Sequence, residues 1–257
     1  MTAPAGKYAS APGRVLLIAA AAGCLLCPLL GAPVWLLLLA AALFLAILAC
    51  GVFFQSSGVF ARPLMAVTTH RAEVAITFDD GPGPHTQALL AALGGHRATF
   101  FVIGERTTPE ALAAIARAGH AVENHSLHHS YLTPFLPPRK LAAELDETTA
   151  RIETACGRRP RWFRPPVGLL SPRVARAAKL AGLQLAGWTA TARDGVARTT
   201  AAQALARLEP HLRPGAILVL HDATERRPVA LDVLPGLLKL LEARQLKCVT
   251  LAELLSG

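Results

Sequence analysis

Residues 73–82 read Glu-Val-Ala-Ile-Thr-Phe-Asp-Asp-Gly-Pro, and this segment is the most informative one about the fold. Residues 74–78 form a short run rich in β-branched and aromatic side chains, which predicts a buried strand. Two carboxylates, Asp79 and Asp80, follow the strand directly. Acids at the carboxyl end of a strand are typical of α/β folds, in which chemically active groups gather at that end.

The chain that follows alternates short strands with helices. We expect further strands at residues 98–103, 121–124, 162–164, 184–188, 216–220 and 247–250, with Ala- and Leu-rich helices between them. This alternation favours parallel strands joined by right-handed crossovers, in an α/β barrel or an open doubly wound sheet. Neither Gly-x-Gly-x-x-Gly nor a P-loop motif follows the first strand, so the sequence gives no support to a dinucleotide or P-loop site.

The chain before residue 62 has a different composition. No charged side chain lies between Arg14 and Arg62, and residues 15–54 are apolar residues, glycine and proline throughout. A membrane helix needs about 20 such residues, so the run predicts a helical hairpin broken near Gly31. A cleaved signal peptide is the competing interpretation, but its removal would leave the second span. We expect residues 1–61 to form a membrane anchor of one or two transmembrane helices and residues 62–257 to form one domain.

The charges allow an estimate of partners and location. The net charge of +9 is spread along the chain, and no nucleic-acid-binding motif accompanies it, so we expect membrane lipids and no nucleic acid as partners. Lys7 and Arg14 precede the apolar run, and Arg62 and Arg71 follow it, so the flanks show no asymmetry. We expect a membrane protein of the bacterial inner-membrane type, with the side of the domain left open.

Polar side chains also follow the later strands. They are His125 and His129 after residues 121–124, Arg164 at the end of residues 162–164, Asp194 after residues 184–188, and His221 after residues 216–220. Because the carboxyl ends of parallel strands meet on one face, we expect these side chains to line one mouth.

Two of these histidines predict a metal site. His125 and His129 are four residues apart, so on a helical turn they share one face, and Asp80 can add a carboxylate oxygen. Two imidazoles and one carboxylate leave coordination positions open, which suits catalytic zinc, although cobalt, nickel or manganese can use the same ligands. A His-x-x-x-His pair taken alone favours a polar loop that binds nothing over a metal site.

Five motifs in order carry a resemblance to a known family. They are Thr77-Phe78-Asp79-Asp80-Gly81-Pro82, His125-Ser126-x-x-His129, Arg164-Pro165-Pro166-Val167-Gly168, Trp188 with Asp194, and Leu220-His221-Asp222. Together they resemble the NodB-type polysaccharide deacetylases, carbohydrate esterase family 4, over residues 73–255. The resemblance implies a distorted (β/α)7-type barrel and a hydrolase that removes an N-acyl group, most often acetyl, from an amino sugar.

The resemblance also implies a role for each matching residue. It implies Asp79 as general base, Asp80, His125 and His129 as metal ligands, Arg164 as the residue that orients the base, the backbone N–H of Val167 as oxyanion donor, and His221 held by Asp194 as general acid. Relatives often carry an aromatic residue before the glycine of the third motif, where this chain has Val167. Around the fourth motif they often carry Asp and Trp, where this chain has Thr191 and Gly195. Aromatic faces for stacking on a sugar are therefore missing at these positions.

Two substrate classes and one non-enzymatic function stay open. The expected substrate is an N-acylated amino sugar, either in a polymer such as peptidoglycan or on a lipid carrier. A membrane anchor raises the local concentration of lipid-linked sugars more than that of wall polymer, which favours the second class. The alternative is a membrane-tethered, non-catalytic glycan-binding or scaffold protein with a decayed site. The complete set of metal, base and acid candidates argues against this alternative.

Overall fold

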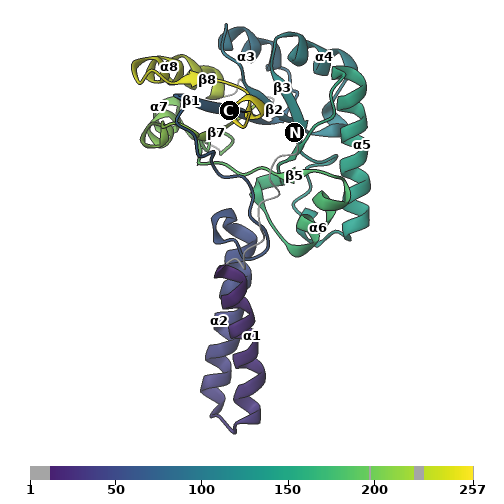
Figure 1. Ribbon diagram of the computed structural model, residues 1–257, viewed down its shortest axis with the longest axis vertical. Helices are drawn as coiled ribbons and strands as arrows, with labels where there is room; N and C mark the ends of the chain where they lie inside the picture. The colour runs from purple at the N-terminus through teal and green to yellow at the C-terminus, as the bar shows by residue number, and fades with distance from the viewer. Residues whose placement is uncertain (1–11, 197, 223–228, 257) are drawn as a thin grey trace.

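The computed structural model describes residues 12–196, 198–222 and 229–256, so Lys7 lies outside the described residues. A pair of antiparallel helices, α1 (Pro12–Leu29) and α2 (Val34–Phe53), projects from an α/β domain as a stalk (Figure 1). The turn between the two helices contains Gly31, whose φ of 64° is accessible to glycine at little cost.

The two helices differ in their fitness to cross a membrane. α2 has 20 residues and a mean hydropathy of 2.9, so by length and composition it can cross a bilayer. Its length corresponds to about 30 Å, the thickness of the hydrocarbon layer. The apolar part of α1, Gly13–Leu29, is shorter. A signal sequence has the same composition as α2, so the structure supplies one candidate span where the sequence predicted one or two.

A curled parallel sheet forms the centre of the domain. Its strands are β1 (Glu73–Gly81), β2 (Thr99–Val102), β3 (Ala121–Asn124), β4 (Trp162–Phe163), β5 (Gln184–Leu185), β6 (Ala190–Thr191), β7 (Ile217–His221) and β8 (Lys247–Cys248). They lie in the order β5-β4-β3-β2-β1-β7-β6, with β8 beside the start of β1, and every pair is parallel. The predicted α/β class is confirmed, in the form of a barrel that stays open between β5 and β6.

The open side of the sheet contains the main departure from the predicted strands. Residues 184–188 were expected to form one strand, but β5 ends at Leu185 and a further strand, β6, follows. Between the two, single bridges join Leu64 to Ala186 and Ala66 to Ala216. The segment that leads from the helix pair into β1 therefore occupies the place where a closed barrel would have continuous strand pairing.

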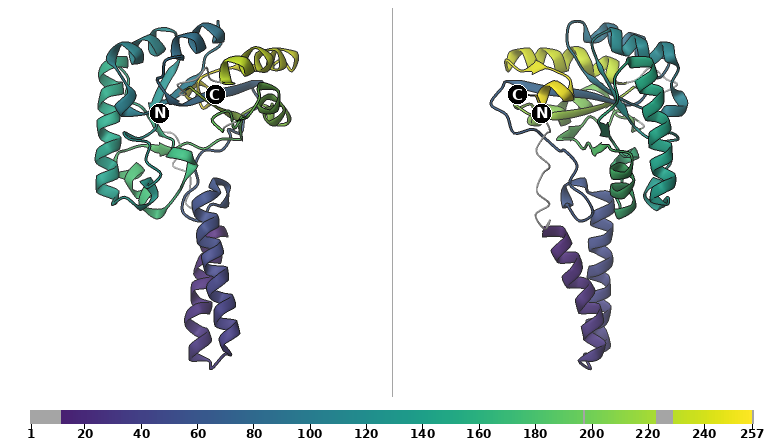
Figure 2. Two further views of the ribbon diagram at one scale, coloured as in Figure 1. Left: turned by 180° about the vertical axis from the view of Figure 1, so that it is seen from behind. Right: turned by 45° about the vertical axis from the view of Figure 1, so that its right-hand side comes forward.

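Helices pack around the outside of the sheet (Figure 2). They are α3 (Thr86–Leu93), α4 (Pro109–Arg117), α5 (Pro138–Cys156), α6 (Pro172–Leu180), α7 (Ala201–Leu208), α8 (Val229–Ala243) and α9 (Leu251–Leu254). Thr108 and Ser171 cap α4 and α6 by accepting backbone N–H groups, and each is followed by proline at the first helical position. In the core, the Phe78 and Phe100 rings stack with centroids 4.9 Å apart. This packing holds the strands, and therefore the residues at their ends, in fixed positions.

The strand register aligns the carboxyl ends. Asp79 on β1 is the partner of His221 on β7, and Asn124 on β3 is the partner of Phe163 on β4. Residues that follow these pairs therefore emerge at one edge of the sheet.

The helix pair is joined closely to the domain. The backbone N–H of Leu170 donates to the carbonyl of Val52 at 3.1 Å, and Val59 and Phe60 are buried. The division of the chain at residue 61 stays a prediction, and the segment just before it packs on the domain.

Candidate active site

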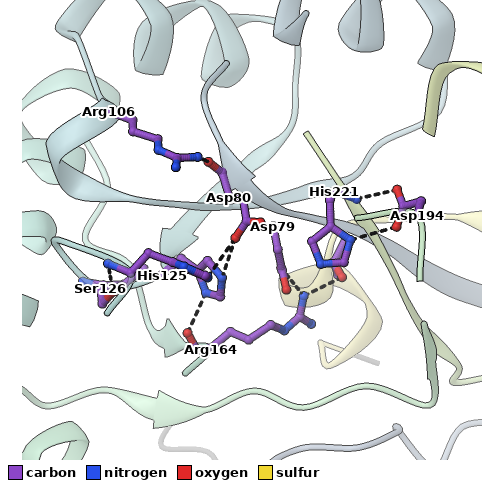
Figure 3. Close-up of polar contacts among 11 residues, drawn as sticks. Asp79, Asp80, Arg106, His125, Ser126, Arg164, Asp194 and His221 are labelled. Carbon is purple, nitrogen blue, oxygen red and sulfur yellow. Dashed lines mark hydrogen bonds and ion pairs between the residues drawn. The ribbon is translucent and has the colours of Figure 1, made fainter. Parts of the chain in front are cut away.

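A cavity of about 620 Å³ lies at the carboxyl ends of the strands. Among the predicted site residues, Asp79, Asp80, His125, His129, Val167 and His221 line it. Arg164 and Asp194 do not line the cavity, but each contacts a residue that does (Figure 3). The structure thus brings all eight predicted residues into one site.

Three of these residues form a group that can hold a metal ion. The Oδ1 atom of Asp80 lies 3.2 Å from Nε2 of His125 and 3.1 Å from Nε2 of His129. This buried oxygen has no hydrogen-bond partner among the described residues. Burial acts to raise the pKa of Asp80, but the two imidazoles beside it lower that pKa well below its usual range. A carboxylate facing two ring nitrogens fits a divalent cation between them.

His125 is held in the form that a metal requires. Its Nδ1 atom lies 2.7 Å from the backbone carbonyl of Arg164. A carbonyl only accepts hydrogen bonds, so Nδ1 carries a proton, and Nε2 is the ring nitrogen left to bind a metal. His129 is positioned by its backbone N–H, which donates to the Ser126 hydroxyl at 3.1 Å.

Several residues of the site have left-handed backbone. The φ angles are 72° at Asp80, 70° at Ser126, 51° at His129 and 54° at Val167. Such angles are uncommon outside glycine, most of all for a β-branched residue such as Val167, and they concentrate at functional sites. Local propensity does not favour this backbone, so the surrounding packing must hold it.

Asp79 lies beside the group of Asp80, His125 and His129, and it forms a buried ion pair with Arg164. Nη1 of Arg164 donates to Oδ1 of Asp79 at 2.6 Å and to the Thr77 hydroxyl at 2.7 Å, while Nη2 donates to the carbonyl of Gly187 at 2.9 Å. The guanidinium lies 4.0 Å from the centroid of the Phe101 ring. Burial lowers the pKa of Arg164, and the charge and hydrogen bond of Asp79 act against that change. The contacts fix the orientation of the Asp79 carboxylate.

His221 lies across the cavity in a second ion pair. Its Nδ1 atom is 2.8 Å from Oδ1 of Asp194, and its backbone N–H donates to Oδ2 of the same carboxylate at 2.8 Å. Burial acts to lower the pKa of His221, but the hydrogen bond and charge of Asp194, with the charges of Asp79 and Asp80, outweigh it and raise the pKa to about 9. His221 is therefore protonated at neutral pH, the state that a general acid needs.

The cavity also has walls that the sequence did not predict. Aromatic rings come from Tyr131, Phe53 and Phe54, beside Trp188 of the fourth motif, and Gln55 adds an amide. Tyr131 could have been found from its place two residues after a metal-ligand candidate. Phe53 and Phe54 gave no signal, because they continue an apolar run typical of a membrane helix.

Two histidines close in sequence to the first two motifs lie outside this group. His128 is exposed and lies 2.8 Å from Glu105 through Nδ1, and His85 precedes α3. Neither lines the cavity.

Comparison with known proteins places this geometry in a family. Residues 66–186 match the family described as polysaccharide deacetylase. A chitooligosaccharide deacetylase of Bradyrhizobium sp. is 35% identical over 172 residues, which cover 62% of this chain and 78% of the relative.

Two solved structures share the fold. A mutant, with restored enzymatic activity, of a CE4-family pseudoenzyme from Bacillus anthracis superposes with a TM-score of 0.68 at 26% identity, over 76% of this chain and 71% of the other. A family 4 acetyl xylan esterase from Clostridium thermocellum, in complex with a cobalt ion, gives a TM-score of 0.65 at 32% identity, over 70% and 89%. The resemblance inferred from the motifs is confirmed, and the chain belongs to the polysaccharide deacetylases of carbohydrate esterase family 4, metal-dependent hydrolases of acylated sugars.

Proposed function

We propose that this enzyme removes N-acetyl groups from an amino sugar, of the N-acetylglucosamine type, in a glycan held near the membrane. The observation that carries the proposal is the meeting of a base, an acid and a metal group in one cavity. Asp79 and His221 are partners across β1 and β7, and the ligand group of Asp80, His125 and His129 lies beside them. A decayed, non-catalytic site would not be expected to retain the full set.

The metal proposed for this group is zinc. One carboxylate and two imidazoles are a common ligand set for catalytic zinc, and cobalt, nickel or manganese accept the same atoms. When bound, zinc would lower the pKa of a water molecule and polarise the acyl carbonyl.

Two residues of the chain, Asp79 and His221, would then each carry out one of the proton transfers. Asp79 accepts a proton from the attacking water, and Arg164 keeps the carboxylate aimed. The backbone N–H of Val167 donates to the negative charge that develops on the acyl oxygen when water attacks the acyl carbon. His221 gives its proton to the departing amine, and Asp194 keeps the imidazole charged and oriented.

The helix pair would place this chemistry at a membrane. We propose that residues 1–61 anchor the chain in a membrane of the bacterial inner-membrane type and that residues 62–257 form the deacetylase domain. α2 is the observation that supports the anchor.

Acetate release tests the proposed function. Full-length protein in detergent micelles, loaded with zinc, should release acetate from a chitooligosaccharide, and a chelator should stop the release until zinc is restored. Protein that retains zinc yet releases acetate from no N-acetylated amino sugar would contradict the proposal.

The pH profile of the rate should report the Asp194–His221 pair. Because the acid must be protonated, activity should persist in alkaline solution and fall as the pH rises through about 9, the pKa of His221. Asp194→Asn removes the charge that raises this pKa, while burial still lowers it. We expect the alkaline limb of kcat/KM, which reports the free enzyme, to move towards or below the usual histidine value of 6.5. An alkaline limb unchanged in this variant would contradict the role of Asp194.

A further inference from the structure

One wall of the active-site cavity comes from the chain that precedes the matched family region. Residues 53–56, at the end of α2 and in the short 3-10 helix Gln55–Ser57, line the cavity, whereas the family match begins at residue 66. We propose that this wall binds substrate and that the substrate is an amino sugar carried on a lipid. Gln55 binds the sugar, and Phe53 and Phe54 contact the lipid chain. The inference rests on the proposed function and narrows its substrate class.

The domain holds this wall in place. The hydrogen bond from Leu170 to Val52 fixes the end of α2 against the loop that carries the oxyanion candidate. Gln55 lies so close to Gly168 and Gly187 that a Cβ atom at either glycine would collide with its side chain. The helix end is therefore built into the site.

Gln55 is a buried polar residue that lacks a partner. Its side chain lines the cavity and is only 6% exposed, and neither its Nε2 nor its Oε1 has a hydrogen-bond partner among the described residues. Burying an unpaired amide costs free energy, so such groups usually serve a ligand or another function. An amide offers two donors and an acceptor, which suit the hydroxyl and acetamido groups of an amino sugar.

The two phenylalanines carry the apolar surface of α2 up to the cavity. Phe53 is 67% exposed and Phe54 is 62% exposed, although both line the cavity. Below them, the surface of α2 exposes apolar side chains such as Leu38 and Leu45. Large exposed apolar surfaces mark contacts with lipid or another apolar partner. A hydrocarbon chain can therefore follow the helix while its head group enters the site.

The cavity lies at the end of α2, at the height where a lipid-linked sugar would meet the protein if α2 spans the membrane. The 20 residues of α2 match the hydrocarbon thickness, so an inserted helix places Phe53 at the membrane surface. A lipid-linked sugar carries its first ring at that same surface. Its N-acyl group can reach the metal group without the lipid leaving the membrane, whereas a wall polymer must approach from solvent.

A substrate competition with the full-length protein tests the inference. Zinc-loaded protein in phospholipid nanodiscs would be given N-acetylglucosamine linked through phosphate to a polyprenyl chain, or a soluble chitooligosaccharide, and kcat/KM for acetate release would be measured for each. We expect the wild type to prefer the lipid-linked substrate. The double variant Phe53→Ala/Phe54→Ala should lower the ratio of lipid-linked to soluble kcat/KM by about tenfold or more, because it removes apolar contact area.

A second variant separates binding by Gln55 from a structural role. Gln55→Leu removes an unpaired buried amide at similar volume, so the thermal unfolding midpoint should not fall. The value of kcat/KM should fall about tenfold for both substrates, since both carry the sugar. Unchanged kcat/KM in this variant would overturn the role of Gln55.

Phe135→Ala is the matched control for the phenylalanines. Phe135 is 67% exposed, like Phe53, but does not line the cavity, so the substrate ratio should stay at the wild-type value. Equal losses for both substrates in the Phe53 and Phe54 variant would show stacking on the sugar and overturn the lipid contact. A wild-type preference for the soluble oligosaccharide would also overturn it. Release of acetate from neither substrate, with zinc bound, would instead overturn the proposed function itself.

Discussion

Asp79→Asn is expected to lower kcat for acetate release by about 10³-fold while the metal content of the protein stays the same. General-base catalysis contributes about 10² to 10⁴ in rate, and an amide cannot accept the proton. Asp79 is not part of the group formed by Asp80, His125 and His129, so the ligands stay in place. The amide oxygen can still accept from Arg164, which is completely buried. Acetate release and metal content by mass spectrometry measure the two effects on one sample.

The same substitution at an exposed site gives the control. Asp146→Asn changes an exposed aspartate of α5 and should leave both quantities unchanged. Loss of metal from Asp79→Asn would show that this carboxylate is a ligand. A rate that matches the wild type would remove Asp79 from the chemistry.

His125→Ala is expected to abolish both metal retention and turnover. His125 supplies a buried ring nitrogen 3.2 Å from Oδ1 of Asp80, and alanine leaves that oxygen with one imidazole. Loss of residues that only orient a ligand typically costs 10- to 100-fold in metal affinity, so loss of the ligand itself should exceed about 100-fold. Metal content after dialysis, together with acetate release, measures the result.

A neighbouring histidine makes this test specific. His128→Ala removes an imidazole from the same segment, but that imidazole is exposed and contacts Glu105. This variant should keep its metal and its activity. If His125→Ala kept a full complement of zinc, the ligand assignment would be wrong.

The sequence predicted the strands that carry the chemistry because their signals are local. Residues 74–78 show the composition of a buried strand, and this composition does not depend on distant contacts. The convergence of Asp80 with His125 follows from parallel strand order. The backbone contacts of the site could not be predicted in this way. The hydrogen bond from His125 to the carbonyl of Arg164, for example, uses a backbone group that every residue has.

The wall supplied by residues 53–56 shows what the sequence could not reveal. Phe53 and Phe54 are apolar residues that suit either contact with lipid or the wall of a cavity. Because they end a long apolar run, the sequence alone does not indicate that they line a cavity. Gln55 is buried only because Gly168 and Gly187, more than a hundred positions later, leave room for it. The break between β5 and β6 likewise depends on bridges made by Leu64 and Ala66.

Arg164 has a consequence for any effort to redesign this enzyme. Its guanidinium positions the carboxylate of Asp79, and its own carbonyl sets the tautomer of His125. The proposed proton acceptor and the proposed metal ligand are thus mechanically linked through one residue, so neither can be tuned alone. Libraries intended to change the metal preference should keep Arg164 constant and vary Tyr131, which borders the cavity and whose ring lies edge-on to that of His129, with centroids 6.3 Å apart.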